Sequence, residues 1–119
     1  MRKILYVDDE LTNLLLFEAN FSDKYTVVIA ESGFKGLEIM ENHPDISIII
    51  SDMKMPVMNG LEFIKKAKEK YPNTRFYILT GFEITPEIQN ALDSGLILKY
   101  FCKPFDVNDI ESTIENEFR

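Results

Sequence analysis

The segment "IIISDMKMPVMNG", residues 48–60, places Asp52 at the end of an apolar run and follows it with a Met-Pro turn. An earlier segment, "KILYVDDE" at residues 3–10, repeats this arrangement, because its apolar run stops at Asp8 and Asp9. Both runs have the length and the β-branched or aromatic content of buried strands. The sequence therefore predicts carboxylates at the ends of two buried strands.

Three further runs of this kind follow along the chain, and segments with the helical spacing of apolar residues separate them. The predicted strands are 3–7, 25–30, 46–51, 75–79 and 98–102. The predicted helices are 11–21, 33–42, 60–71, 84–92 and 107–118, of which 33–42 has the weakest pattern. Strands that alternate with helices and are apolar on both faces indicate an α/β fold, with a parallel sheet, right-handed crossovers and helices on both faces.

The composition narrows the class of protein. A chain of 119 residues with 45 % apolar residues suits one domain, residues 1–119, with one core. The formal charge of −7, with scattered lysines and arginines, argues against a nucleic-acid surface. We find no secretory signal and no apolar run near the roughly 18 residues that cross a bilayer, so we expect a cytoplasmic protein without membrane contact. The lone cysteine, Cys102, permits no internal disulfide and is expected to be a small core residue.

A parallel sheet would bring the polar strand ends together. The carboxyl ends of its strands lie at one edge, where open α/β sheets bind their ligands. Asp8, Asp9 and Asp52 should therefore converge at this edge. Thr80 follows the fourth predicted strand and Lys103 follows the fifth, so both should join the same crevice.

Three carboxylates in one crevice require a cation, since two unit charges about 4 Å apart repel by roughly 1 to 4 kcal/mol near a protein surface. Lys103 supplies one positive charge. A cluster of oxygen ligands without histidine or cysteine also suits Mg²⁺, which accepts one or two carboxylates together with substrate phosphate oxygens. A carboxylate can attack phosphorus when an ammonium, a hydroxyl and a metal ion surround the transferred group. The residues therefore predict a phosphoryl-transfer site.

The four motifs at these strand ends resemble those of one family. They are "VDDE" at 7–10, "SDMKMPVMNG" at 51–60, "LTG" at 79–81 and "KYFCKPF" at 99–105. Over essentially its whole length the chain resembles the receiver domain of two-component response regulators. The resemblance implies a doubly wound five-stranded parallel sheet with the flavodoxin-like strand order 2-1-3-4-5.

The same resemblance implies roles for individual residues. Asp52 would be the phosphoacceptor. Asp8 and Asp9, together with Asp52 and the backbone carbonyl of Lys54, would hold Mg²⁺, with Mn²⁺ able to substitute for it. Lys103 would contact the phosphoryl group.

Two further features follow from the family resemblance. Thr80 would assist catalysis beside Lys103 and would form a switch pair with Tyr100. The peptide bond between Lys103 and Pro104 would be cis, a form that proline makes far less costly than other residues do.

The implied function is a signalling phosphoacceptor domain rather than an enzyme, since it would catalyse only its own phosphorylation and dephosphorylation. Its donor would be the phosphohistidine of a sensor histidine kinase or of a histidine phosphotransfer protein. Its output would pass to an effector domain or protein through the face of helix 84–92, strand 98–102 and helix 107–118. No nucleic acid and no membrane would bind this chain.

The sequence also permits other interpretations. Asp8 taken alone could cap the first helix, Thr80 and Lys103 could be solvated surface groups, and Tyr100 could be an ordinary sheet aromatic. A flavodoxin-type flavin protein shares the strand plan, although "VDDE" puts anions where its phosphate would bind. An aspartyl phosphatase shares the chemistry but would carry its nucleophile after the first strand. A receiver-like protein-interaction module without phosphorylation is the remaining alternative, and the effect of Lys54 on phosphoryl lifetime is open.

Overall fold

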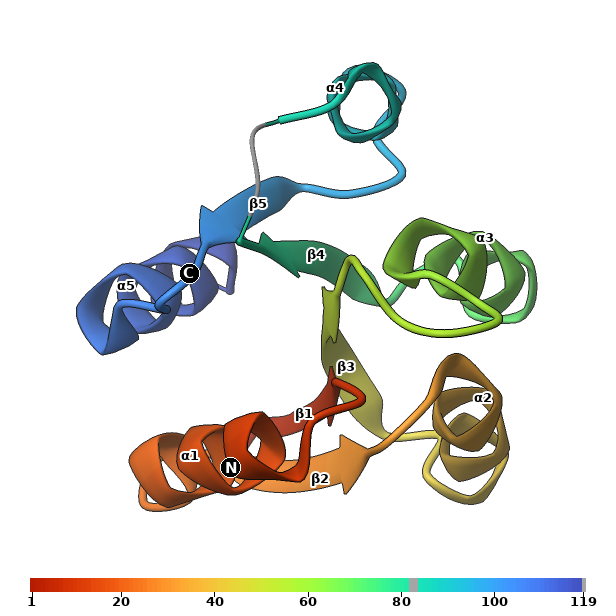
Figure 1. Ribbon diagram of the computed structural model, residues 1–119. Coiled ribbons are helices and arrows are strands. Elements are labelled where there is room, and N and C mark those ends of the chain that lie inside the picture. Colours follow the sequence, from red (N-terminus) through yellow and green to blue (C-terminus); the bar gives the residue numbers. More distant parts are fainter. Residues whose placement is uncertain (82–83, 119) are drawn as a thin grey trace.

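The computed structural model describes residues 1–81 and 84–118 and shows strands and helices alternating along the chain (Figure 1). The strands are β1 Lys3–Val7, β2 Thr26–Ala30, β3 Ile46–Asp52, β4 Arg75–Thr80 and β5 Lys99–Cys102. The helices are α1 Leu11–Phe21, α2 Gly33–Asn42, α3 Gly60–Lys70, α4 Pro86–Asp93 and α5 Val107–Glu117. None of these helices in the described ranges is both long and apolar enough to cross a membrane.

The five strands form one sheet in the order β2-β1-β3-β4-β5, and every neighbouring pair is parallel. The predicted fold class and strand order are confirmed. In the register, Ile50 of β3 lies between Tyr6 of β1 and Tyr77 of β4. All the strands therefore end at one edge of the sheet, which we call the carboxyl edge, and begin at the opposite amino edge.

Helices cover both faces of the sheet, as Figure 1 shows. Side chains alternate between the faces along each strand. Tyr6 and Ile50 pack with Phe17 of α1 and Ile114 of α5, whereas neighbours such as Val7 pack on the side of α2, α3 and α4. The three central strands are buried on both faces, which explains their continuous apolar sequence.

Helix α2 has the weakest apolar pattern, and two of its glycines let it lie close to α3. A Cβ atom on Gly33 would lie 2.7 Å from the sulfur of Met58, and one on Gly36 would lie 2.9 Å from the Phe63 ring. Ser32 caps the helix by accepting a hydrogen bond from the backbone N–H of Lys35 at 3.1 Å. The glycines thus add close contacts with Met58 and Phe63 to the apolar contacts that Leu37, Ile39 and Met40 make with the core.

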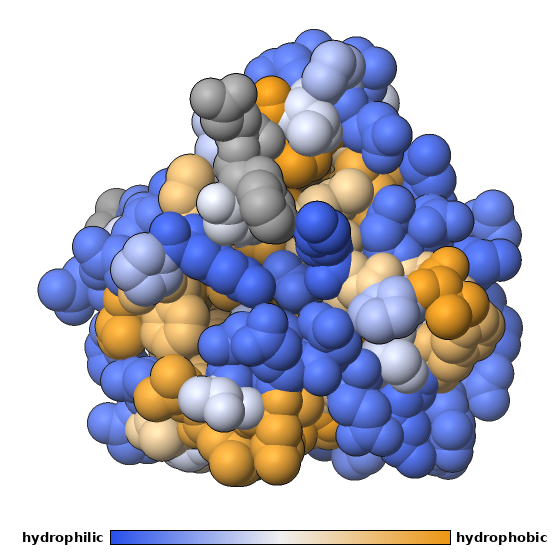
Figure 2. Space-filling view, in the orientation of Figure 1, coloured by the Kyte–Doolittle hydropathy of each residue, from blue (hydrophilic) through white to orange (hydrophobic). Residues whose placement is uncertain are grey.

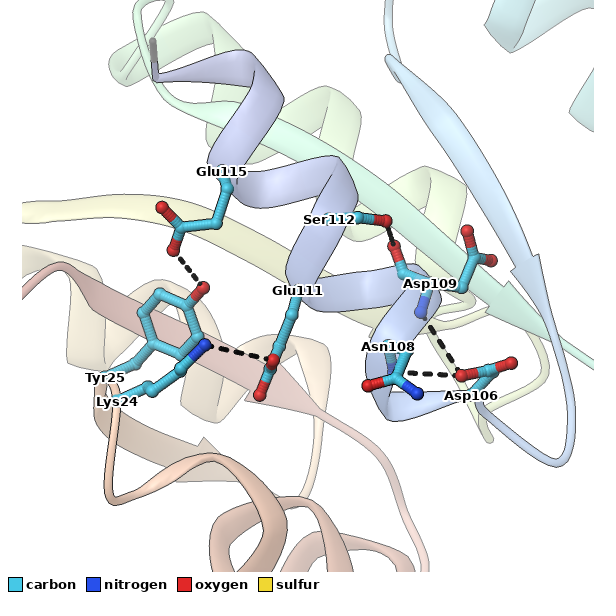
Figure 3. A network of polar contacts seen from close by, with 8 residues as sticks. All are labelled: Lys24, Tyr25, Asp106, Asn108, Asp109, Glu111, Ser112 and Glu115. Carbon is cyan, nitrogen blue, oxygen red and sulfur yellow. Dashed lines mark hydrogen bonds and ion pairs between the residues drawn. The ribbon is translucent and has the colours of Figure 1, made fainter.

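Helix α5 is tied to the turn between α1 and β2 (Figure 3). The hydroxyl of Tyr25 donates to Glu115 at 2.8 Å, and the ammonium of Lys24 lies 3.2 Å from Glu111. Asp106 caps the helix by accepting from two backbone N–H groups of its first turn. Tyr25, predicted as the first residue of a strand, therefore lies just before β2 and links it to α5.

One sequence prediction is wrong. Cys102 was expected in the core, but it is exposed at the end of β5. Side chains alternate along β5, so Cys102 lies on the face opposite the buried Phe101, and it belongs to neither core cluster.

Candidate functional site

The predicted site residues meet at the carboxyl edge. Asp8 follows β1, while Asp52 and Thr80 end β3 and β4, and these three side chains are almost completely buried. Asp9 is exposed at the mouth of the crevice. Asp8, Asp9 and Asp52 each offer a carboxylate oxygen within 4.8 Å of the others. The convergence expected from a parallel sheet is confirmed for these carboxylates.

Lys103 enters the same crevice from the end of β5. Its Nζ lies 2.9 Å from Oδ1 of Asp52 and 3.8 Å from Oδ2 of Asp8. Its backbone N–H donates to the carbonyl of Thr80 at 2.8 Å, so β4 holds the residue in place. The Lys103–Pro104 peptide bond is cis, as the family resemblance implied. Lys103 is therefore an ion-pair partner of Asp52 rather than a solvated surface lysine.

Asp8 is held from two directions. Its Oδ1 accepts the backbone N–H of Glu10 at 3.0 Å, and its Oδ2 accepts the hydroxyl of Tyr6 at 2.7 Å. Tyr6 was not predicted as a site residue, because a tyrosine inside an apolar run is typical of a core residue. Its spacing of two residues from Asp8 was the available signal, since residues i and i+2 of a strand point to the same face.

The charges in the crevice are unbalanced. Burial raises the pKa of Asp52 above its ordinary value, and the charges of Asp8 and Asp9 raise it further, against the opposing bond to Lys103. For Lys103, burial alone would lower the pKa, but the hydrogen bond to Asp52 and the charges of Asp52 and Asp8 raise it. Both shifts have one cause in common, which is an excess of negative charge that penalises a carboxylate and favours an ammonium.

The loop between β3 and α3 is folded tightly over Asp52. Gly60 donates its backbone N–H to the carbonyl of Met53 at 2.9 Å, and a Cβ atom at Gly60 would collide with the Asp52 carbonyl. Asn59 and Glu62 form a capping box that begins α3 at this point. The glycine thus allows the helix to begin directly against the strand that carries Asp52.

A cavity of about 240 Å³ opens over these groups. It is lined by Asp52, Thr80 and Lys103 together with Glu10, Lys54 and Gly81. Lys54 itself is exposed, in the loop after β3. Carboxylates, a hydroxyl and ammonium groups therefore surround a space open to a small anionic group.

The two expected switch residues lie on adjacent strands. Tyr100 of β5 is paired with Ile78 of β4, two residues before Thr80. Because side chains alternate along a strand, Thr80, Ile78 and Tyr100 lie on one face of the sheet. Tyr100 is half-buried and packs against the core on the side of α4. The structure thus places Thr80 and Tyr100 as diagonal neighbours.

The donor set of the cluster fits a divalent cation. Asp8, Asp9 and Asp52 offer only oxygen atoms, which are the ligands of hard cations such as Mg²⁺, Ca²⁺ and Mn²⁺. Asp8 and Asp52 are buried with a surplus of negative charge that a cation would offset. The site can therefore hold a divalent metal ion.

This fold and this acidic pocket define the class of protein. The family model described as "Response regulator receiver domain" matches residues 4–115, and the chain belongs to that family of signalling domains. The pocket of Asp8, Asp9 and Asp52 fits the phosphoacceptor site of such a domain. Family membership decides against the flavodoxin-type flavin protein and the aspartyl phosphatase.

Particular relatives agree with this assignment. The chain is 34 % identical over 115 residues to "Sporulation initiation phosphotransferase F" of Bacillus subtilis, covering 95 % of this chain and 90 % of that protein. It is 30 % identical over 118 residues to a "Chemotaxis protein CheY homolog" of Campylobacter jejuni, covering 96 % and 90 %. A response regulator receiver domain protein from Clostridium thermocellum has a similar crystal structure, with a TM-score of 0.90, 33 % identity, and coverage of 98 % of this chain and 93 % of that chain.

Proposed function

We propose that this chain, over residues 1–119, is a phosphoacceptor domain in which Asp52 takes a phosphoryl group from a phosphohistidine. The donor is a sensor histidine kinase or a histidine phosphotransfer protein. The observation that carries the proposal is the position of Asp52, buried below an open polar cavity with the ammonium of Lys103 2.9 Å away. A carboxylate oxygen of Asp52 bonds to phosphorus, the phosphorus–nitrogen bond of the donor breaks, and the imidazole takes up a proton.

We assign the metal to Mg²⁺, with Mn²⁺ as a substitute. Asp8, Asp9 and Asp52 would hold it together with the backbone carbonyl of Lys54. When bound, Mg²⁺ neutralises the charge that develops on the phosphoryl oxygens during transfer. The surplus of buried carboxylate charge supports this assignment, because phosphate oxygens add further negative charge to the same cavity.

Lys103 and Thr80 stabilise the transferred group from its other sides. The Lys103 ammonium, paired with Asp52 before transfer, turns to a phosphoryl oxygen once Asp52 carries the phosphoryl group as an acyl phosphate. The Thr80 hydroxyl donates to another phosphoryl oxygen, since Thr80 lines the same cavity. Charged and hydroxyl donors fixed around a developing anion are worth far more there than in water.

The donor docks beside the crevice, over α1. Leu11, Leu15 and Leu16 are exposed by 66 %, 50 % and 50 %, and Figure 2 shows hydrophobic side chains gathered over α1 next to a hydrophilic centre. A groove of about 610 Å³ lies between α1 and the segment after β5, with Leu16 and Phe105 in its lining. An apolar patch at the mouth of the site suits a helical protein donor. We also propose a cytoplasmic location, where a phosphohistidine donor would meet this domain. The formal charge of −7 argues against binding to nucleic acid.

Phosphorylation changes the output face made by α4, β5 and α5. A phosphoryl group adds about −1.5 to −2 charges near neutral pH. Thr80 moves toward it, and Tyr100, on the neighbouring strand, turns into the space that Thr80 leaves. A shift from 1 % to 99 % active needs roughly 5.5 kcal/mol, more than one hydroxyl hydrogen bond provides, so Lys103 and a bound metal ion would have to share the coupling. An effector domain or protein then binds the altered face.

Intact-protein mass spectrometry tests the phosphoacceptor. We expect acetyl phosphate with Mg²⁺ to add one phosphoryl group to the parent chain, and chelation to prevent the reaction. Asp52→Asn should remain unmodified. An adduct on Asp52→Asn at the parent rate would overturn the assignment. A parent chain that stays unmodified would favour the protein-interaction module without phosphorylation.

Amide chemical shifts test the switch. Thr80→Ala should leave Asp52 phosphorylatable while reducing the response of residues 84–105 to beryllofluoride with Mg²⁺. The loss of one hydroxyl hydrogen bond should lower the ratio of active to inactive protein roughly fivefold, because such a bond contributes about 1 kcal/mol. A response in Thr80→Ala equal to that of the parent would contradict the role of Thr80.

A further inference from the structure

Tyr6 of β1 is a polar group held rigidly beneath the acidic cluster. The side chain is completely buried, and its hydroxyl donates to Oδ2 of Asp8 at 2.7 Å. Its ring stacks on Phe17 of α1, with centroids 4.2 Å apart and planes inclined by 8°. Because the stacked ring fixes the phenol, the hydroxyl imposes a position on the carboxylate rather than following it.

The phenol and Lys103 approach the same oxygen of Asp8. Nζ of Lys103 lies 3.8 Å from Oδ2, which is beyond hydrogen-bond distance, while it binds Asp52 directly at 2.9 Å. The other oxygen, Oδ1, accepts the backbone N–H of Glu10. A carboxylate has about four acceptor positions, so these two bonds leave room for a cation.

We propose that Tyr6 is a positioning residue for the metal-binding cluster, which keeps Asp8 from closing on Lys103 and so leaves this carboxylate open to a divalent cation. Without the phenol, Oδ2 of Asp8 is free to turn toward the ammonium and form a direct ion pair. A cation can then bind Asp8 only after the ion pair between Asp8 and Lys103 is broken. This inference rests on the proposed function, because it concerns the metal that phosphoryl transfer requires.

The phenol has two opposing effects on cation binding, so the direction of the change in Mg²⁺ affinity shows which effect dominates. A donor bound to a carboxylate withdraws negative charge from it, and this effect alone would weaken cation binding. Holding the carboxylate open strengthens cation binding. Removing the hydroxyl therefore weakens Mg²⁺ binding if positioning dominates and tightens it if charge withdrawal dominates.

The test is an Mg²⁺ titration of Tyr6→Phe. The backbone amide shifts of residues 8–10 and 52–54 report the binding. The ring and its stacking on Phe17 are retained. We expect the Kd for Mg²⁺ to rise by roughly tenfold, the low end for loss of a group that orients a metal ligand. Tyr77→Phe is the matched control. Tyr77 is also buried, and it flanks Ile50 on the side opposite Tyr6. Its charged neighbours, however, are Arg75 and Glu117, which lie at the amino edge, far from the crevice.

A double-mutant cycle with Lys103→Met separates positioning from a general loss of stability. If the phenol acts by keeping Asp8 from Lys103, the Kd of Tyr6→Phe/Lys103→Met should match that of Lys103→Met within about twofold. A structural defect would weaken binding in both backgrounds. At saturating Mg²⁺, Tyr6→Phe should also react with acetyl phosphate at the parent rate, although half-maximal rate should need about ten times more Mg²⁺.

The outcomes are distinguishable. An unchanged or lower Kd in Tyr6→Phe, or equal weakening in both backgrounds, overturns the role of Tyr6 while leaving the proposed function intact. A parent chain that shows no saturable Mg²⁺ binding overturns both. Weaker binding that disappears in the Lys103→Met background, with Tyr77→Phe like the parent, supports the inference.

Discussion

The two edges of the sheet differ in how their charged side chains are paired. At the amino edge, charges pair one to one near the surface, as in Lys3 with Asp45 at 3.0 Å and Arg75 with Glu117 at 3.3 Å. At the carboxyl edge, the carboxylates of Asp8, Asp9 and Asp52 gather in one cluster, and Lys103 lies near two of them, the buried Asp8 and Asp52. Exposed pairs contribute little to stability, whereas a buried surplus of one sign is costly.

Two aspartates illustrate the difference. The hydrogen bond from Lys3 lowers the pKa of Asp45 at the amino edge, so its charge is favoured. Burial raises the pKa of Asp52 at the carboxyl edge, so its charge is penalised. The sheet thus neutralises one edge with its own side chains and leaves the other dependent on an external cation. A bound cation would offset this surplus, which supports the proposed metal-assisted phosphoacceptor.

The largest effect should come from removing the ammonium of the crevice. Lys103→Met keeps most of the side-chain stem but deletes the charge that lies 2.9 Å from Asp52. We expect phosphorylation by acetyl phosphate at saturating Mg²⁺ to slow by about 100-fold, the typical cost of losing one donor to a developing anion. Mg²⁺ binding should persist, because the carboxylates remain. A rate within about threefold of the parent would show that Lys103 does not contact the transferred group.

The next effect compares two adjacent acids at the mouth of the crevice. Asp9 supplies an oxygen to the cluster, whereas Glu10 precedes α1 and caps it without a side-chain bond. Asp9→Ala should weaken Mg²⁺ binding by about tenfold or more, and Glu10→Ala by less than about threefold, because a direct ligand contributes more than a neighbouring charge. Equal losses in a titration of the two variants would contradict the assignment of Asp9.

A smaller effect should appear in the pH dependence of the free energy of unfolding when Asp52 is replaced. The folded pKa of Asp52 is raised, so its contribution to stability is present at low pH and is lost as pH rises through that pKa. Ionised Asp52 therefore costs stability at pH 7 without metal. We expect Asp52→Asn to raise the free energy of unfolding by about 1 kcal/mol at pH 7 in chelator, the scale of repulsion between neighbouring carboxylates.

Urea denaturation at several pH values measures this difference. The gain of Asp52→Asn over the parent should shrink as pH falls toward the ordinary carboxyl range near about 4. Saturating Mg²⁺ should reverse the order of the two proteins, since it binds the parent more tightly. An Asp52→Asn variant that is less stable than the parent in chelator at pH 7 would contradict the charge surplus.

The smallest effect should occur at the amino edge. Glu117→Gln removes an exposed ion pair with Arg75 but keeps the shape of the side chain. We expect the free energy of unfolding to change by less than about 0.5 kcal/mol and the Kd for Mg²⁺ to stay the same. Thermal unfolding and the Mg²⁺ titration provide the check. A change of several-fold in Kd would mean that the two edges are coupled.

Much of the fold could be predicted because the pattern of apolar residues carries it. The strands and helices lie within a few residues of their predicted bounds, and the parallel order brings Asp8, Asp52 and Lys103 together. Helix α2 was the weakest prediction, since Gly33 and Gly36 are buried positions of this helix that lie against side chains distant in sequence. Close approach of glycines leaves no periodic signal.

Side-chain bonds and exposure at the sheet edge could not be predicted. The link from Tyr6 to Asp8 depends on the ring orientation that Phe17 imposes from α1. Cys102 has the character of a core residue, but it lies on the face of β5 opposite the buried Phe101 and is exposed. Both features depend on which neighbours the folded chain provides.

The most direct test of the charge surplus is an amide NMR titration of the parent chain with Mg²⁺. We predict saturable shifts at residues 8–10, 52–54 and 103, while the amide resonances of residues 43–46, 73–75 and 117 at the amino edge do not move. The absence of a saturable shift at the carboxyl edge, or shifts of equal size at both edges, would contradict the charge surplus.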